Sequence, residues 1–175
     1  MSKTKYLYFY DHYNDRQNTN ETCFSNYYPS FIKQDKIIFF NAEQHFMYYK
    51  ALHFKDNETA KAIYITLNYR FNVIPRSPQK IRDLGKKVKN FNYKEWEKIK
   101  YVMMYRTIRL KFLQNFNLKC FLLSTKDFIL VNADPLDTIW GTGMSRNDLV
   151  NVDESQWKGD NLLGKVLMNL RKHLG

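Results

Sequence analysis

The sequence contains little cysteine, glycine or proline, and this scarcity excludes several classes of protein. Its 175 residues include 2 cysteines, 6 glycines and 4 prolines. The two cysteines stand far apart and form no CxxC pair, which excludes a disulfide scaffold and a zinc finger. We expect Cys23 and Cys120 to be reduced, buried thiols. No repeat or low-complexity linker divides the chain, and its length fits one compact domain over residues 1–175.

Long apolar runs and several familiar active-site signatures are also absent. No apolar run approaches the length of a membrane span, and the N-terminal segment lacks the apolar core of a signal peptide. We therefore expect a cytoplasmic protein without membrane contact. There is no GxGxxG, GxxxxGK[ST], HExxH or GxSxG motif. His45 and His53 are eight residues apart, which is not a metal-ligand spacing, so we expect ordinary polar roles for them and neither a metal nor another cofactor.

The chain carries a large positive charge. It has 28 lysine and arginine residues against 17 aspartate and glutamate residues, a net charge of +11. Such a charge favours an anionic partner, which could be nucleic acid, nucleotide phosphates or a membrane surface. The composition is also rich in asparagine, isoleucine, tyrosine and phenylalanine, as expected from an AT-rich genome, which adds lysine without any binding role. The charge alone leaves both explanations open.

Hydrophobic periodicity predicts a mainly α-helical α+β domain with a small sheet of short strands at one edge. Strands are expected at 5–13, 36–40 and 128–131. A loop broken by Pro75 and Pro78 is expected before a short helix that stops near Gly85. The other helices are expected from Asn41 to about His53 and at 57–68, 93–115, 117–125 and 162–174. The expected N-caps are Asn41, Asp56 and Asn92. Gln44 is expected to close a capping box with Asn41.

The helix that begins after Asn41 carries a carboxylate and an amine among apolar residues. Glu43 and Lys50 differ by about 20° around the helix axis, and Met47 lies within about 40° of Glu43. Apolar residues on the opposite side indicate that the whole helix is buried, where an unpaired carboxylate is costly. Glu43 and Lys50 are too far apart for the usual i,i+4 pairing, but they could line one cavity. Alternatively, Glu43 binds loop backbone and Lys50 reaches water.

The long helix at 93–115 shows a polar stripe, formed by Lys100, Thr107 and Lys111. It separates two apolar arcs. The first arc contains Trp96, Ile99, Val102, Met103, Leu110 and Leu113, and the second contains Met104, Ile108 and Phe112. The stripe fits a helix that lines a polar cleft, and it fits equally well the edge of a groove where lysines reach solvent.

A further candidate is the segment "VNADPLDTIWGTG", which places Trp140 and Gly141 after two aspartates, Asp134 and Asp137. A tryptophan beside glycine lets the backbone approach a flat ligand, and its indole can stack on a nucleobase. Alternatively, Asp134 caps a short turn and Trp140 belongs to the core.

These segments, taken in order, resemble the NADAR family, also called YbiA-like, over nearly the whole chain. The resemblance rests on "FSNYYPS" (24–30), "NAEQHFMYYKALHF" (41–54), "LGKKV" (84–88) before Trp96, "KFLQN" (111–115), "DTIWGTG" (137–143) and "WKGDNLLGKVLMNLR" (157–171). It implies a compact, mainly helical fold and an N-glycosidase that acts on an anomeric C–N bond. The implied substrates are ADP-ribose attached to guanine in nucleic acid, or phosphorylated ribosylaminopyrimidine intermediates of riboflavin synthesis.

The resemblance and the polar pattern together suggest the site residues. Glu43 is expected to act as the acid/base or sugar-stabilising carboxylate. Lys50 is expected to be the preferred nucleophile, with Lys111 as the second candidate for that role. Asp137 would hold a base edge or a hydroxyl as the third catalytic residue. The substrate-binding candidates are Phe24 and Trp140 for stacking, Lys111 and Arg82 (or Lys86) for phosphate, and Asn26, Trp96, Asn132 and Gly141 as further lining residues.

Asn132 departs from the family pattern, because members often carry a glutamate in this strand. The change could slow, alter or abolish catalysis, Asp134 could replace the carboxylate, or Asn132 could keep its hydrogen bonds and lose only the charge. The positive charge favours ADP-ribosylated DNA or RNA over a free ribosyl phosphate as substrate. Removal of ADP-ribose from guanine is therefore the expected function. A riboflavin-pathway N-glycosidase, a non-catalytic protein that binds ADP-ribose or a nucleotide, and a sequence-nonspecific nucleic-acid-binding protein remain alternatives. The oligomeric state stays open.

Overall fold

The computed structural model describes residues 4–10, 19–66 and 78–175, and the chain falls into two compact units. One unit comprises residues 29–115, and the other comprises residues 1–28 and 116–175. The described parts contain seven α-helices and four short strands, which confirms the mainly helical α+β class. A single domain over 1–175 stays a prediction. The expected loop at Pro75 and the end of the first expected strand lie outside the described residues.

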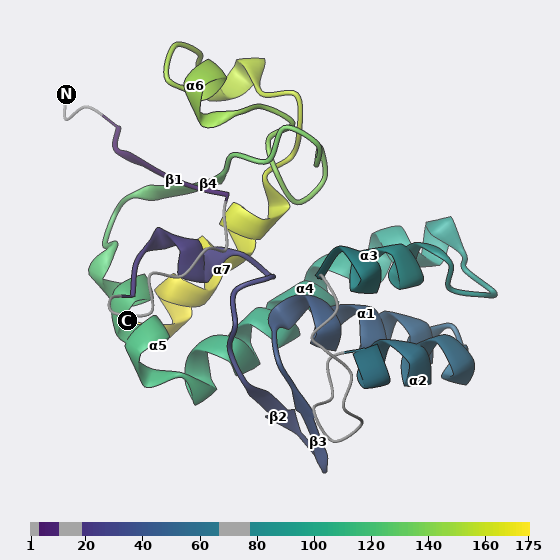
Figure 1. The fold of residues 1–175 in the computed structure, drawn as a ribbon. Helices are drawn as coiled ribbons and strands as arrows, with labels where there is room; N and C mark the ends of the chain where they lie inside the picture. Colours follow the sequence, from purple (N-terminus) through teal and green to yellow (C-terminus); the bar gives the residue numbers. More distant parts are fainter. Residues whose placement is uncertain (1–3, 11–18, 67–77) are drawn as a thin grey trace. The chain divides into compact units, whose positions relative to one another are not determined.

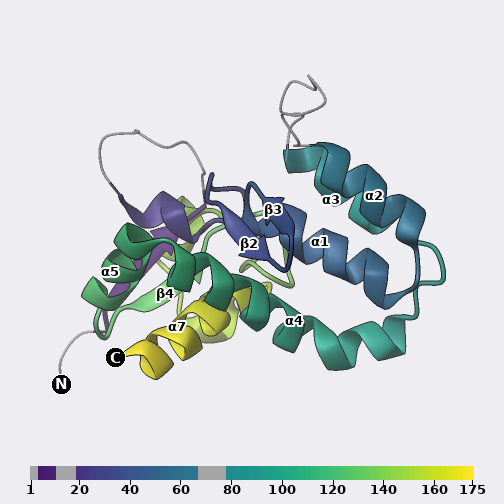
Figure 2. The same ribbon diagram turned by 90° about the horizontal axis from the view of Figure 1, so that it is seen from below.

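The unit formed by residues 29–115 joins a hairpin to four helices. Strands β2 (Ile32–Gln34) and β3 (Ile37–Phe39) pair antiparallel, with Ile32 opposite Phe39. The helices are α1 (Ala42–His53), α2 (Asn57–Thr66), α3 (Pro78–Lys86) and α4 (Tyr93–Gln114). Helices α1, α2 and α3 pack on one another (Figure 1). Helix α4 packs on α1 and on β2 (Figure 2), so α1 lies at the centre of this unit.

The start of α1 follows the predicted cap only in part. The Asn41 side chain accepts a hydrogen bond from the Gln44 amide at 2.8 Å, as predicted. The Gln44 side chain does not return to Asn41. Its oxygen accepts from the Phe40 amide at 2.9 Å, and its nitrogen donates to the Ile63 and Tyr64 carbonyls at 3.2 and 3.1 Å. Because Gln44 is fully buried, these bonds satisfy its amide and tie the start of α1 to the last turn of α2.

Asp56, the predicted N-cap of α2, also accepts a hydrogen bond from outside that helix. The Asp56 carboxylate accepts from the Thr59 amide at 3.0 Å and from the Lys89 amide at 2.8 Å. Burial alone would raise the pKa of Asp56, but these hydrogen bonds outweigh it and hold the pKa below its usual range. Asp56 thereby links the start of α2 to the segment that follows α3.

The polar stripe of α4 faces the interior. Lys100, Thr107 and Lys111 are 9%, 0% and 0% exposed, so the interpretation as a groove edge with lysines in solvent is wrong. Some residues of the first apolar arc are instead exposed to solvent, with Val102 at 50% and Leu113 at 40% exposure. The second apolar arc is fully buried. The helix therefore packs through the second arc, which carries the neighbouring polar residues inward with it.

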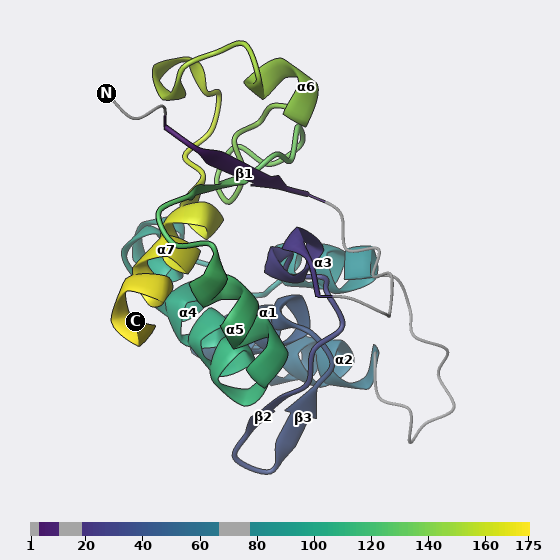
Figure 3. The ribbon, with the colours of Figure 1, turned by 90° about the vertical axis from the view of Figure 1, so that its left-hand side faces the viewer.

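The other unit is built around a parallel strand pair. Strands β1 (Tyr6–Phe9) and β4 (Ile129–Asn132) run parallel, with Phe9 opposite Asn132. Helix α7 (Leu162–Leu174) packs on β4 and on α5 (Phe116–Ser124), as Figure 3 shows. The unit also contains two 3-10 turns, η1 (Glu21–Phe24) and η3 (Glu154–Gln156), and the short helix α6 (Arg146–Leu149). The described strands thus form two sheets of two strands each.

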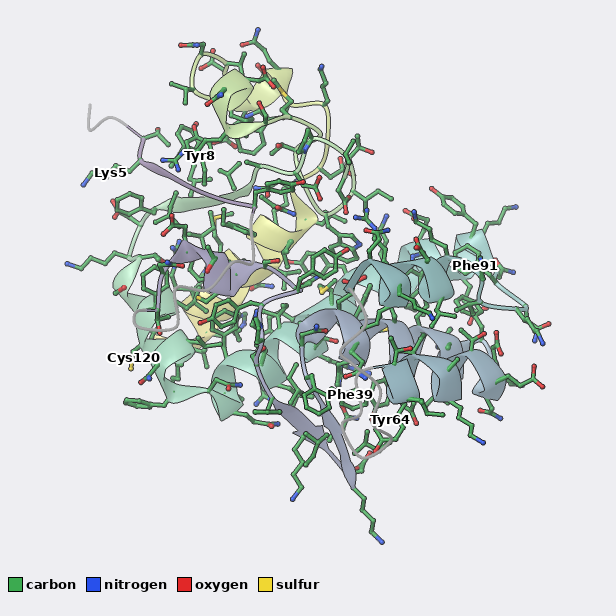
Figure 4. All side chains as sticks on the ribbon, in the orientation of Figure 1. Lys5, Tyr8, Phe39, Tyr64, Phe91 and Cys120 are labelled. Carbon is green, nitrogen blue, oxygen red and sulfur yellow. The ribbon has the colours of Figure 1, made fainter. Side chains whose placement is uncertain are left out.

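One cysteine differs from the expectation. Cys23 is buried, but Cys120 on α5 is exposed (Figure 4), so the prediction of two buried thiols is wrong for Cys120. Helix α5 buries Leu118 and Leu122, which share a face, and Cys120 falls between them on the opposite side. Across the described ranges, no helix is both long and apolar enough to cross a membrane.

Candidate active site

Lys50 lies in a largely enclosed environment, with little of its side chain open to solvent. The side chain is 9% exposed, and its amine donates a hydrogen bond to the Gly85 carbonyl at 2.9 Å. The same nitrogen lies 4.6 Å from the ring centre of Phe91 and 5.0 Å from that of Trp96. A carbonyl and two aromatic faces are groups that stabilise an ammonium. Of the two interpretations of this helix face, the one that sends Lys50 into solvent is therefore wrong.

Glu43 acts on Lys50 from the same face of α1. Glu43 is 5% exposed and belongs to the first helical turn, where the helix dipole favours a carboxylate. Burial lowers the pKa of Lys50, and the charge of Glu43 opposes that shift without cancelling it. A lowered pKa gives a lysine more of the neutral amine that can act as a nucleophile. The predicted pair is thus electrostatically coupled, and the structure brings it together with Trp96.

Gly85 allows α3 to approach α1 closely enough for this contact. A Cβ atom at position 85 would lie 2.2 Å from the Met47 sulfur and 3.3 Å from the Met47 Cβ. Any side chain at this position must push Met47 aside or separate the two helices. The close approach explains why the Gly85 carbonyl can accept from Lys50.

We expect Gly85→Ala to lower the free energy of unfolding by about 1–3 kcal/mol, because the added methyl overpacks the α1–α3 contact. Urea denaturation followed by circular dichroism measures the loss. Combining the change with Met47→Ala should recover part of it, since the shortened side chain vacates the space. If the double variant is no more stable than Gly85→Ala alone, the contact with Met47 is not the cause of the destabilisation.

The remaining predicted residues of this unit occupy α3 and α4. Trp96 packs on Phe46 and Phe54, with ring centres 5.5 and 6.3 Å apart, and is 9% exposed. Arg82 is half-buried on α3. Lys111 is fully buried on α4. Phosphate binding by Arg82 and Lys111 stays a prediction.

In the other unit, Asp137 organises the predicted Trp–Gly loop. Its side-chain oxygen accepts from the Ile139 amide at 3.0 Å and from the Trp140 amide at 2.8 Å. Trp140 is half-buried, so it is not a core residue. Asp134 accepts from the Leu136 amide at 2.8 Å, in agreement with the interpretation that it caps a turn. Base binding by Asp137 and Trp140 stays a prediction.

Asn132 and Gly141 meet at the base of this loop. The Asn132 side chain is 8% exposed, and its nitrogen donates to the Trp140 carbonyl at 3.3 Å. A carboxylate cannot donate a hydrogen bond, so a glutamate at this position could not hold the Trp140 carbonyl in the same way. A Cβ atom at Gly141 would lie 2.8 Å from the Asp137 carbonyl oxygen and 3.2 Å from that of Asn132. The tight backbone path therefore requires glycine at position 141.

Asn161 also holds this loop, and sequence reasoning missed it. Asn161 is 1% exposed, and its backbone adopts the left-handed conformation, with φ of 49°. Its side-chain oxygen accepts from the Asn132 amide at 2.9 Å, and its nitrogen donates to the Leu130 carbonyl at 3.0 Å. Its own amide donates to the Gly141 carbonyl at 3.0 Å. An asparagine directly before the apolar run of α7 was the available signal, because asparagine tolerates left-handed backbone better than most residues.

The two candidates near η1 have different surroundings. Phe24 is fully buried, and its ring centre lies 5.5 Å from that of Phe9 and 5.4 Å from that of Phe121. This is the environment of a core residue. Asn26 follows η1 and is half-buried. Contacts of Phe24 and Asn26 with a substrate stay predictions. In the described residues, no three histidine, cysteine, aspartate or glutamate side chains gather in a way that could hold a metal ion.

Comparison with known proteins assigns the fold and the family. The NMR structure of E. coli YbiA matches with a TM-score of 0.73 and 26% sequence identity, over 99% of this chain and 87% of that chain. The chain thus has the fold of YbiA. The family model of the NADAR domain matches residues 8–175, and the chain belongs to this family.

Two relatives in sequence bear on function. N-glycosidase R617 of Acanthamoeba polyphaga mimivirus is 36% identical over 98% of both chains. The chloroplastic riboflavin biosynthesis protein PYRR of Arabidopsis thaliana is 38% identical over 82 residues, which is 46% of this chain and 12% of that protein.

Proposed function

We propose that this chain is an N-glycosidase that removes ADP-ribose from guanine bases in nucleic acid. It is a hydrolase of N-glycosidic bonds, the class named for its viral relative R617. The observation that carries the proposal is the pairing of Glu43 and Lys50 on one buried face of α1, where the charge of Glu43 acts on Lys50.

The pair supplies the two kinds of group that this reaction needs. Cleavage of a ribosyl C–N bond develops positive charge at the anomeric carbon and leaves an electron pair on the departing base. The Lys50 amine adds to the anomeric carbon, the C–N bond breaks, and the base leaves with the proton that the amine loses. Water then adds to the same carbon and releases the lysine, so the protein ends unchanged. Glu43 accepts and returns protons in both steps.

Net charge favours a substrate carried by nucleic acid. The chain has a charge of +11, and each phosphate contact with lysine or arginine adds to affinity by releasing counterions. Binding of such a substrate is therefore expected to weaken steeply with salt. The predicted roles of Asp137 and Trp140 in holding the base, and of Arg82 and Lys111 in holding phosphate, belong to this proposal.

The second candidate substrate is a phosphorylated ribosylaminopyrimidine intermediate of riboflavin synthesis. The specific observation in its favour is the 38% identity to the riboflavin biosynthesis protein PYRR. The chemistry at Glu43 and Lys50 would be the same, because the bond broken is again between an anomeric carbon and nitrogen. Asn132, in place of the family's frequent glutamate, favours a third candidate, in which ADP-ribose is bound and not cleaved.

The deciding experiment offers both substrates to the purified protein beside a Glu43→Gln variant. We expect release of ADP-ribose from modified guanine in DNA, detected by chromatography, and loss of release in the variant. Release from the ribosylaminopyrimidine phosphate alone would move the assignment to riboflavin chemistry. No release from either substrate, together with ADP-ribose binding in calorimetry, would contradict the enzyme and favour the binding protein.

A further inference from the structure

A pocket of about 310 Å³ lies on the side of α1 that faces away from Glu43 and Lys50. Its walls come from the end of β2, from α1 and from α4, all within the unit of residues 29–115. His45 and Tyr49 lie about 200° and 240° around the α1 axis from Glu43. The pocket is therefore separate from the candidate active-site face, and nothing in the proposed reaction uses it.

A neutral histidine forms one wall of this pocket. His45 is 3% exposed, and its ring nitrogens lie 2.9 Å from the Thr107 hydroxyl and 2.8 Å from the Gln34 side-chain oxygen. Burial lowers the pKa of His45 to about 4, so the ring is uncharged at neutral pH. Because the Gln34 oxygen only accepts, His45 donates to it and accepts from Thr107. Gln34 consequently keeps both N–H groups of its amide for another partner.

Donor groups dominate the polar lining. Within the described parts of the chain, the Gln34 amide nitrogen, the Tyr49 hydroxyl and the Arg106 guanidinium have no hydrogen-bond partner. Burial raises the pKa of Tyr49 to about 12, and Asp35 adds to the shift, so the hydroxyl keeps its proton and can donate. His53, which also lines the pocket, is already engaged, because its Nε2 lies 2.6 Å from a carboxylate oxygen of Glu95.

The rest of the lining is apolar. Leu52 on α1 and Met103 on α4 complete the wall beside the donors. A ligand that fits must offer several acceptor oxygens and negative charge to the donors, and a compact body to the apolar side chains. Phosphate meets the first requirement, since arginine can bind two of its oxygens at once.

We propose that this pocket is a second binding site, which takes the phosphate monoester of a small sugar or nucleoside. Arg106 binds the phosphate, Gln34 and Tyr49 donate to its oxygens, and the sugar or base rests on Leu52 and Met103. The same phosphate chemistry could come from the end of a nucleic acid strand, so the test includes both sources.

Methyl NMR can observe the site directly. Met103 lines the pocket, while its neighbour Met104 is fully buried on the same helix and serves as an internal control. In protein labelled at methionine methyls, ribose 5-phosphate, AMP and a 5′-phosphorylated oligonucleotide are titrated separately, each beside its dephosphorylated form. We expect the Met103 signal to shift saturably with the phosphorylated compounds while Met104 changes little. The compound that saturates at the lowest concentration identifies the source.

Arg106→Ala should raise the dissociation constant of the phosphorylated compound, as read from the Met103 signal, at least tenfold. Tyr49→Phe should raise it severalfold without altering the packing of the ring. Arg109→Ala is the matched control, because Arg109 is exposed on the same helix and does not line the pocket. Equal affinity in the Arg106 and Arg109 variants would overturn the proposal. So would the absence of a Met103 shift at tens of millimolar phosphate monoester.

Discussion

Replacing Lys50 by methionine is expected to reduce glycosidase turnover by a factor of about 10³ or more. The methionine side chain has nearly the length of lysine and packs well against Phe91 and Trp96, so the wall of the site stays filled. What is lost is the amine, together with its bond to the Gly85 carbonyl. Single-turnover kinetics on ADP-ribosylated DNA measures the effect without interference from product release.

Lys100→Met is the matched control for this change. Lys100 is also 9% exposed, and it also lies within the unit of residues 29–115. Its amine is held by the Glu97 carboxylate at 2.8 Å, where no chemistry is proposed. If both lysine variants lose activity equally, or if Lys50→Met keeps activity within threefold of the unaltered protein, the catalytic assignment of Lys50 is wrong.

A nucleophilic lysine and a merely cationic one respond differently to two further tests. A Schiff base between Lys50 and the opened sugar can be reduced with borohydride, and mass spectrometry then finds the sugar on the peptide that contains Lys50. Lys50→Arg keeps the charge but removes the nucleophile, because arginine stays protonated. We expect an adduct and an inactive arginine variant. An active Lys50→Arg protein without an adduct would show that only the positive charge is needed.

Glu43→Gln complements these variants. Removal of a general acid or base typically costs a factor of about 10²–10⁴ in rate. Since Glu43 raises the pKa of Lys50 against the effect of burial, the glutamine variant should also lower the pKa of Lys50 further. Because only the neutral amine attacks, the rise of the residual activity with pH should then occur at lower pH, and this displacement would report the coupling. An unchanged pH profile would contradict it.

The parts of the fold that sequence could predict depend on neighbouring residues. Asn41 and Asn92 cap helices by accepting from amides three residues on, at 2.8 and 3.1 Å. Asp56 does the same for α2. The spacing of Glu43 and Lys50 likewise follows from helix geometry alone, so their shared face could be recognised. These interactions lie within one turn or one helix, where the sequence pattern carries the whole signal.

The parts that sequence could not predict depend on distant partners. The Lys50 amine meets a carbonyl 35 residues along the chain, and His45 meets Thr107 at a separation of 62. Periodicity assigned the stripe of α4 to either of two environments because a buried threonine and a solvated one look alike in sequence. In the structure Thr107 is fully buried and its hydroxyl lies 2.9 Å from a ring nitrogen of His45, a partner that the periodicity of α4 does not reveal.

Asn161→Ala is expected to lower the free energy of unfolding by about 3–5 kcal/mol. The change leaves the Asn132 amide and the Leu130 carbonyl buried without the partners they have now, at about 1–3 kcal/mol each. Alanine also tolerates the left-handed backbone at φ of 49° less well than asparagine. Urea denaturation followed by circular dichroism measures the loss, with Asn151→Ala, at an exposed position, as the control.

Two further variants separate the backbone effect from the hydrogen bonds. Asn161→Gly removes the same side-chain bonds but accepts a left-handed backbone, so it should be more stable than the alanine variant by about 1 kcal/mol. Asn161→Asp keeps the acceptor for the Asn132 amide and sets a carboxylate oxygen against the Leu130 carbonyl, so it should be destabilised mainly through that repulsion. Hydrogen exchange should then stay slow at the Asn132 amide in the aspartate variant and become fast in the alanine variant. Fast exchange in both would show that the side-chain oxygen at position 161 does not protect the Asn132 amide, and the assigned hydrogen bond between them would fail.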